Sequence, residues 1–535
     1  MLSFSLLRQQ WIPVVTLDGD PDLLGIEDVF GRAHELRCVR AEAPIVTAAL
    51  YRMLLAFAHR IYDGPRSLEE WSRLWEAREF EKEPLDKYWQ DHPDAFELLG
   101  GDRPFMQCPG LSTVEPKSAA QLLLYRARGN NTTLFDHTTD GERPDLPADV
   151  AARWLVTVQS FDTGGTKTPY EKKKSSKSGL CNHFATVILE GDNLKETLLL
   201  NMVLYAPDLG LPLPTTTAED HPIWERNQPP GPEPVEEGQF PKGWTDLLTW
   251  PSRRILLHGR DTEDGVLVDG TVIAPGTQFG AELQQIEAMA AFQKPNKKEV
   301  FYPVRLEILR GVWRHAAELL LPTAGLGVRL RPLSIENIAE LVDNTLPADK
   351  VITLRVFGQK LMSNPGAVEY WSEEALPVKL ALLRAQNIDW MLELLFGYAV
   401  RLADEVGAAL QQMTKNYSNE LRGDFDQYKH WSYLAERYWP RLDAEFAQLL
   451  RNVGDVVQTY RHDDREGRAR LKEHFEKWQA HVDGTAREAV QTWVDEFPRV
   501  VPRQLFAMAS TEMIFLGALK KLNEKYTHDV DQRTR

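Results

Sequence analysis

The sequence is poor in cysteine and has no long apolar run, and both features exclude classes of protein. Its 535 residues include three cysteines, Cys38, Cys108 and Cys181, which lie far apart and form no Cys-x-x-Cys pair. This spacing excludes a disulfide framework and a cysteine-rich zinc site, and it is typical of a reducing compartment. No stretch approaches the roughly 18 uninterrupted apolar residues of a membrane span, and the N-terminus lacks the pattern of a signal peptide. We therefore expect a soluble, cytoplasmic protein.

Positive charge is also in deficit. The chain has 62 Lys and Arg against 78 Asp and Glu, a formal net charge of -16 at pH 7. Affinity for phosphate comes from clustered Lys and Arg, so this balance argues against a protein that binds nucleic acid over its whole surface. Hydrophobic residues make up 43% and charged residues 26%, which excludes a disordered or collagen-like chain. A nucleic-acid site would therefore have to be a local basic cluster.

Motifs of catalysis are missing as well. The sequence contains no HExxH, GxSxG or GxxxxGK[ST] motif. Residues 164–168 (GGTKT) resemble the last of these only superficially, because Thr166 separates the glycines from Lys167. The run His462-Asp463-Asp464 offers half of a metal-dependent phosphohydrolase centre, but it lies in a polar link and a solvated turn is the better interpretation. We expect no enzyme activity, no metal and no cofactor.

The first two thirds of the chain mix helix and strand patterns. Helical periodicity predicts helices over Pro44–Ile61 and around Leu68–Trp75. Apolar, β-prone runs predict strands within Leu6–Val15, Trp154–Val158, Thr186–Leu189, Arg254–His258 and Gly265–Ile273. The polar segment Phe161–Leu180 is then expected to be a long loop between two strands.

The pattern changes near Trp371, where glycine and proline become rarer. Long amphipathic periods cover Leu380–Gly407, Tyr433–Val453, Glu466–Val482 and Pro502–Lys525, with a shorter one over Arg487–Phe497. Long helices joined by short links favour a helix bundle. We therefore predict an α+β fold, with a large mixed domain of residues 1–370 and a C-terminal four-helix bundle of residues 371–535.

One basic cluster stands out within the polar segment. Eleven residues hold five lysines against a single acid, Glu171, and paired glycines precede them: Gly164, Gly165, Lys167, Lys172, Lys173, Lys174 and Lys177. Flexible lysines can neutralise backbone phosphates, and glycines let the main chain approach a nucleic acid without an intervening Cβ. A solvated, disordered loop is the alternative interpretation of this segment.

Several segments, in order along the chain, together resemble one family. They are Leu6-Leu7 with Trp11-Ile12-Pro13-Val14, Arg103-Pro104-Phe105-Met106-Gln107, the run from Gly129 to His137 (GNNTTLFDH), Thr163-Gly164-Gly165 through Ser178-Gly179-Leu180, Leu198-Leu199-Leu200-Asn201, and the C-terminal helices. On these segments the chain resembles the large subunit of Cascade, the guide-RNA surveillance complex of type I-E CRISPR antiviral defence (the CasA family).

This resemblance implies a function and a set of partners. Members of the family are not enzymes; they recognise the protospacer-adjacent motif in duplex DNA, start strand separation and help recruit a helicase-nuclease. The implied partners are the target duplex, the 5′ end of the guide RNA, and the backbone and small subunits of Cascade. Gly164 and Gly165 would face the minor groove, and the neighbouring lysines would contact phosphate. The minor groove distinguishes mainly A·T from G·C, so several related motifs would be tolerated.

Two further segments receive roles from the resemblance. Asn130, Asn131 and Phe135 lie in the loop that would reach the guide RNA. A strand, Leu354–Phe357, followed by a turn would carry the strand-separating wedge, for which Met362, Ser363 and Asn364 are the candidates. A plain Asn-Pro-Gly turn and a core phenylalanine are the alternatives at these positions. For the whole chain, a scaffold subunit that does not read the motif and a metal-dependent nuclease or hydrolase stay open.

Overall fold

The structure, a computed structural model, describes most of the chain. It covers residues 2–126, 144–170, 173–205, 218–226, 235–263, 265–280, 286–294, 300–306, 311–322, 329–362, 367–384, 389–421, 427–460, 464–496 and 501–535. These fall into two units. Unit 1 comprises Met1–Arg305, Pro332–Asn337 and Leu354–Glu373, and unit 2 comprises Leu306–Arg331, Ile338–Thr353 and Glu374–Arg535. Residues 306–331 and 338–353 therefore group with the C-terminal helices.

Unit 1 mixes helices with small sheets. Its helices are α1 (Ile26–Gly31), α2 (Pro44–Ile61), α3 (Leu68–Glu76), α4 (Lys82–Asp91), α5 (Ala148–Phe161), α6 (Leu194–Asn201) and α7 (Trp244–Leu248). Its strands are β1 (Ile12–Thr16), β2 (Pro21–Leu24), β3 (Leu36–Val39), β4 (Lys117–Ser118), β5 (Leu146–Pro147), β6 (Gly165–Tyr170), β7 (Lys173–Ser176), β8 (Thr186–Glu190), β9 (Val235–Gln239), β10 (Arg253–Thr262), β11 (Gly265–Pro275), β12 (Thr277–Phe279), β13 (Phe292–Gln293) and β14 (Tyr302–Pro303).

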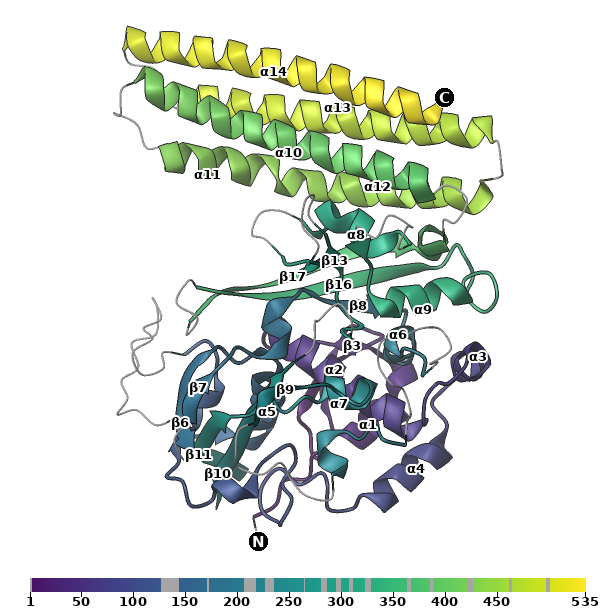
Figure 1. The fold of residues 1–535 in the computed structure, drawn as a ribbon, viewed down its shortest axis with the longest axis vertical. Coiled ribbons are helices and arrows are strands. Elements are labelled where there is room, and N and C mark those ends of the chain that lie inside the picture. Colours follow the sequence, from purple (N-terminus) through teal and green to yellow (C-terminus); the bar gives the residue numbers. More distant parts are fainter. Residues whose placement is uncertain are drawn as a thin grey trace. The chain divides into compact units, whose positions relative to one another are not determined.

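The centre of unit 1 is helix α2, which has the bounds that the sequence predicts. Pro44 stands in its first turn, where a fixed φ suits the helix and the missing N–H costs nothing. Sixteen of its 18 residues are buried, as expected of a helix that is apolar on all sides. Helices α5, α6 and α7 pack against it (Figure 1).

The strand predictions have mixed outcomes. The strands predicted at 186–189, 254–258 and 265–273 are confirmed as β8, β10 and β11, and the opening strand as β1, which pairs with β2 and β3. The strand predicted over Trp154–Val158 is wrong, because these residues lie in α5. Eleven of the 14 residues of α5 are buried. Burial on all sides removes the helical alternation from the sequence and leaves a β-branched run that imitates a strand. The loop predicted between Phe161 and Leu180 instead contains the β6–β7 hairpin.

Two long strands belong partly to each unit. They are β16 (Val351–Leu361) and β17 (Val368–Lys379), and together with β8 they form a three-stranded sheet in the order β17-β16-β8. The predicted strand Leu354–Phe357 is confirmed within β16. Helix α9 (Leu333–Leu341) also has residues in both units, and the two-residue strand β15 (Arg329–Leu330) lies in unit 2.

The C-terminal helical region predicted from the sequence is confirmed. Unit 2 contains the short α8 (Ala316–Leu320) and the longer α10 (Asp389–Glu420), α11 (Gln427–Tyr438), α12 (Pro440–Thr459), α13 (Arg465–Glu496) and α14 (Pro502–Thr534). Figure 1 shows α10, α13 and α14 side by side, with α11 and α12 following one another in a row. An aromatic cluster fills the space between them, with Trp313 stacked on Phe446 and Trp478 against both.

The helix boundaries differ from the predicted ones: the stretch predicted over Leu380–Gly407 corresponds to α10, which begins at Asp389 and ends at Glu420, and two divisions between helices also differ. The stretch Tyr433–Val453 is divided between α11 and α12, because Pro440 has no N–H with which to continue the helix of the preceding residues. The break predicted between Val482 and Arg487 is absent, since α13 runs through it. An ion pair of 2.6 Å between Asp483 and Arg487 spans that point, and Gly484 costs the helix only about 1 kcal/mol.

Candidate nucleic-acid interface

The basic cluster of the sequence forms the antiparallel hairpin β6–β7. Gly165 pairs with Ser176, Thr166 with Ser175, and the turn end is closed by Tyr170 and Lys173. The hairpin follows directly on helix α5, so its base lies where the buried helix ends. A lysine-rich sequence has little tendency to form strands by itself, and the contacts at the base provide what the sequence lacks.

A buried cluster of charges holds the base of the hairpin. Asp162 is completely buried, and its carboxylate accepts bonds of 2.5 Å from the Arg253 guanidinium and from the Lys167 ammonium. Arg253, on β10, also donates to the carbonyl oxygen of Lys177 at 2.7 Å and to that of Thr163 at 3.3 Å. Both ends of the hairpin are therefore tied to β10. Because the Lys167 side chain is only 8% exposed, this geometry favours a structural role for it over the phosphate contact predicted from the sequence.

The glycines at the base of the hairpin differ in the space that surrounds them. A Cβ at Gly179 would lie 2.5 Å from the carbonyl oxygen of Ser160, so no side chain fits there. Gly164 is tight too, with Ser178 N 3.2 Å from the ideal Cβ position. Gly165 is different, because a Cβ there would meet no atom within 4 Å, while its φ of +111° favours glycine. Gly165 thus combines a left-handed main chain with open space in front of it.

The structure describes only some of the remaining candidate residues. Lys174 and Lys177 are exposed, as a phosphate contact requires. Lys172 and the side chain of Lys173 lie outside the described residues. The guide-RNA candidates Asn130, Asn131 and Phe135 also lie outside them, and so do the wedge candidates Ser363 and Asn364. Met362, the third wedge candidate, is described.

Met362 stands at the end of β16, where the strand leads into its turn. The residue is 39% exposed, so an apolar side chain is accessible at this point. Its main-chain N–H donates to the carbonyl oxygen of Ala367, the residue before β17, at 3.0 Å. The chain therefore presents an accessible apolar side chain directly after β16.

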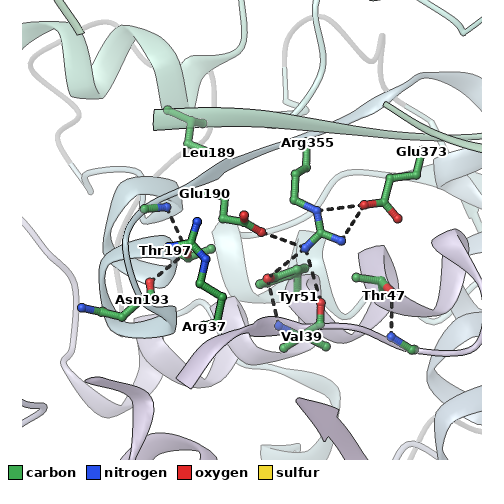
Figure 2. Close-up of polar contacts among 12 residues, drawn as sticks. Arg37, Val39, Thr47, Tyr51, Leu189, Glu190, Asn193, Thr197, Arg355 and Glu373 are labelled. Atoms are coloured by element: carbon green, nitrogen blue, oxygen red, sulfur yellow. Dashed lines mark hydrogen bonds and ion pairs between the residues drawn. The ribbon is translucent and has the colours of Figure 1, made fainter. Parts of the chain in front are cut away.

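Arg355 anchors the strand that leads to Met362 (Figure 2). Its guanidinium forms ion pairs with Glu190 of β8 at 2.9 Å and with Glu373 of β17 at 2.6 Å, and it donates to the carbonyl oxygen of Val39 and the hydroxyl of Tyr51 at 3.4 Å each. Burial raises the pKa of the Tyr51 hydroxyl far above its usual range, so it stays neutral beside the cation. Four elements, β3, α2, β8 and β17, thus fix one arginine of β16.

Gln359 connects this strand to the base of the lysine hairpin. Its side-chain amide donates to the carbonyl oxygen of Phe161 at 2.9 Å and to Oδ1 of Asn182 at 2.6 Å, while its own oxygen accepts a bond from the Trp371 indole at 2.7 Å. Asn182 in turn donates to the carbonyl oxygen of Asp162 at 3.0 Å. The two segments assigned to DNA from the sequence therefore share one buried hydrogen-bond network, whose members carry no recognisable sequence motif.

The described part of the chain shows neither a metal-ion cluster nor a membrane-spanning helix. Its described residues contain no group of three or more His, Cys, Asp or Glu side chains placed to hold a metal ion. His462 and Asp463 lie outside them. No described helix is long and apolar enough to cross a membrane.

Comparisons with known proteins agree on one family. The family model for CRISPR-associated protein Cse1 matches residues 5–489. The CRISPR-associated protein CasA/Cse1 of Thermus thermophilus is 31% identical over 98% of this chain and 98% of its own length. The crystal structure of Thermobifida fusca Cse1 superposes with a TM-score of 0.80 at 25% identity, over 98% of each chain. A chain of a CRISPR RNA-guided surveillance complex shares the fold, with a TM-score of 0.73 at 19% identity over 96% of this chain and all of that chain.

A mixed α/β unit followed by long packed helices is thus the architecture that this chain shares with Cse1 proteins. The chain belongs to the Cse1 (CasA) family, the large subunit of type I-E Cascade, and the resemblance noted in the sequence is confirmed.

Proposed function

We propose that this subunit recognises the protospacer-adjacent motif in duplex DNA, starts strand separation beside it and helps recruit the helicase-nuclease, without catalysing a reaction itself. The observation that supports this most directly is the network around Gln359. It joins the base of the lysine hairpin to the strand that leads to Met362. A motif reader and a wedge must keep a fixed spacing along the duplex, and a buried network provides that rigidity.

The hairpin has the chemistry for the first task. Lys174 and Lys177 offer exposed cations on a chain whose net charge is -16, so phosphates are attracted to this hairpin rather than to the surface in general. Gly165 presents open space and a main chain that a narrow minor groove can approach. In the proposal, Lys172 and Lys173 add to this charge, and Lys167 stabilises the base of the hairpin through its ion pair with Asp162.

The turn after β16 is assigned the second task. An apolar side chain inserted between base pairs kinks and partly unstacks a duplex at a cost of a few kcal/mol per step. Met362 has the exposure and chemistry for this insertion. Ser363 and Asn364 remain proposed as polar members of the same wedge, and Asn130, Asn131 and Phe135 as the contact to the 5′ end of the guide RNA.

The test of the hairpin uses charge reversal in the assembled complex. Lys174→Glu with Lys177→Glu should weaken binding to every target that carries the motif, and should lower the slope of log affinity against log salt by about 2, one for each lost phosphate contact. Lys87→Glu, at an exposed position on α4 that has no assigned role in DNA binding, is the control. An unchanged affinity and slope in the double variant would favour a scaffold whose hairpin contacts no DNA.

A nuclease is the remaining alternative, and it makes a different prediction. The isolated chain would then cleave nucleic acid in the presence of a divalent metal, and Asp463→Ala would abolish the cleavage. We expect no cleavage by either protein in a gel assay with labelled duplex and single strand.

A further inference from the structure

A cavity of 210 Å³ opens beside the base of the lysine hairpin. It is lined by Ser176, Lys177, Ser178, Leu180, His183, Trp250, Ser252, Arg253, Gly276, Thr277, Gln278 and Phe279. These residues come from the end of β7, the turn that follows it, the start of β10 and strand β12. An engineered apolar cavity of about 150 Å³ already binds benzene, so this one has room for a single aromatic base.

One wall of the cavity is aromatic and rigid. The rings of Trp250 and Phe279 meet edge to face, with centroids 4.9 Å apart. The Trp250 indole donates to the carbonyl oxygen of Thr277 at 3.2 Å, and the N–H of Thr277 donates to the carbonyl oxygen of Pro251 at 2.9 Å. A Cβ at Gly276 would lie 2.4 Å from that same oxygen, so the wall allows no side chain there. The ring positions are therefore fixed before any ligand arrives.

The opposite wall is polar and carries no acid. Lys177 is exposed at the cavity, and Arg253 is paired with Asp162 behind it. Ser178 Oγ and His183 Nε2 lie 3.2 Å apart. Burial, with the neighbouring Arg305 and Lys177 cations, lowers the pKa of His183, so the imidazole is neutral at pH 7 and both donates and accepts hydrogen bonds. None of the twelve lining residues is acidic.

A neighbouring cavity shows that this composition is not general. The second cavity, of 300 Å³, shares Trp250 and Thr277 with the first but is also lined by the acids Glu219 and Asp246 and by the cations Arg226 and Lys242. Acids and cations occur there in equal number, and Arg226 pairs with Asp246, so the second cavity offers an anion no net positive charge. The first cavity, by contrast, combines an aromatic wall, a neutral hydrogen-bonding pair and a cation, which are the features that bind a base and its phosphate.

We propose that the first cavity receives one unpaired nucleotide, with its base against Trp250 and Phe279 and its phosphate at Lys177. The inference rests on the proposed function, because an opened duplex beside the hairpin is what supplies an unpaired nucleotide. The base edge meets Ser178 and His183, whose donor and acceptor roles adapt to more than one base. The cavity therefore captures a base without demanding a particular sequence.

The test uses the full chain and two DNA duplexes of the same sequence. In one duplex a 2-aminopurine is an unpaired single-nucleotide bulge, and in the other it is paired with thymine. We expect the bulged duplex to bind about tenfold more tightly by anisotropy, because stacking of one base contributes about that factor. We also expect the 2-aminopurine emission to fall on binding, since the base then lies against an indole.

Three variants separate the cavity from the phosphate contacts. Phe279→Ala should reduce the preference for the bulge to less than about twofold, and Lys177→Gln, at an exposed position that leaves folding intact, should reduce both the preference and the affinity. Lys174→Gln, on the same hairpin but not at the cavity, should weaken both duplexes equally and keep the preference.

Equal affinity of the native chain for the two duplexes, or no binding of either at about 50 mM salt, would overturn the assignment of the cavity. Neither result would contradict the proposed function. That function depends on motif recognition by the assembled complex, which is measured in a separate experiment on the complex.

Discussion

The side-chain amide of Gln359 donates a hydrogen bond of 2.9 Å to the main-chain carbonyl oxygen of Phe161, 198 positions earlier in the chain. Phe161 is the last residue of α5, just before the lysine hairpin, and Gln359 stands three residues before Met362. One side chain therefore fixes the spacing between the two segments that we assign to DNA, and this spacing is what the first prediction tests.

Replacing Gln359 should lower both the stability of the subunit and the ability of the complex to open a duplex. Gln359→Ala leaves the Trp371 indole and the Phe161 carbonyl without their buried partner, which costs about 1–3 kcal/mol of unfolding free energy for each unsatisfied group. Urea denaturation measures that cost. In the complex, we expect the variant to lose affinity for an intact duplex and to bind a pre-melted target nearly as well as the native subunit. Equal losses on both targets would contradict a role of the network in positioning the wedge.

Removing the buried carboxylate at the hairpin base should be severe. Asp162→Asn leaves the Lys167 and Arg253 cations buried together without a countercharge, and we expect a loss of about 3–5 kcal/mol in urea denaturation. Asp145→Asn is the matched control, because its partner Arg260 is half exposed and surface pairs contribute at most about 1 kcal/mol. A small effect at Asp162 would mean that the hairpin does not depend on this cluster.

Some of the fold could be predicted from the sequence, and the failures have a common cause. Helix α2 was predicted to the residue because Pro44 and Asp63-Gly64-Pro65 mark its ends locally. The β6–β7 hairpin was not predicted, because its stability depends on Arg253, 91 positions away from Asp162. The ion pair of Lys167 with Asp162 has the same origin, since a buried lysine cannot be distinguished from a solvated one in the sequence without the partner element.

The glycines of the hairpin base should respond differently to the same change. Gly179→Ala brings a methyl group to within 2.5 Å of the Ser160 carbonyl oxygen and should lower the unfolding free energy by about 2–3 kcal/mol. Gly165→Ala meets no atom and should cost about 1 kcal/mol, from its left-handed φ alone. For DNA binding we expect the reverse order, with the larger loss at Gly165. Thermal melting together with target binding separates the two effects.

Glu374 gives unit 2 a pH dependence of its own. Burial, with a smaller effect of the nearby Asp443, raises the pKa of its carboxyl to about 7, although it accepts a hydrogen bond from the main-chain N–H of Val312. A carboxyl whose folded-state pKa lies above its unfolded value binds its proton more tightly in the folded state. Stability should therefore fall as pH rises from about 4.5 to about 7.

The variant Glu374→Gln keeps an acceptor for Val312 and removes the titration. We expect its urea midpoint, relative to the native chain, to be higher at pH 8 than at pH 5. Glu369→Gln, an exposed carboxylate paired with Lys360, should show no such change. A difference between native chain and Glu374→Gln that is independent of pH would contradict this assignment.

The central claim is that this subunit reads the sequence beside the target, and one measurement tests it most directly. This chain is added to a guide-RNA complex that was assembled without it. The affinity of the resulting complex is then measured for duplexes with one matched protospacer and varied flanking trinucleotides. We predict that the restored affinity depends on the flank and that several related flanks are accepted. Restored affinity that is the same for every flank would contradict motif reading and leave a scaffold subunit.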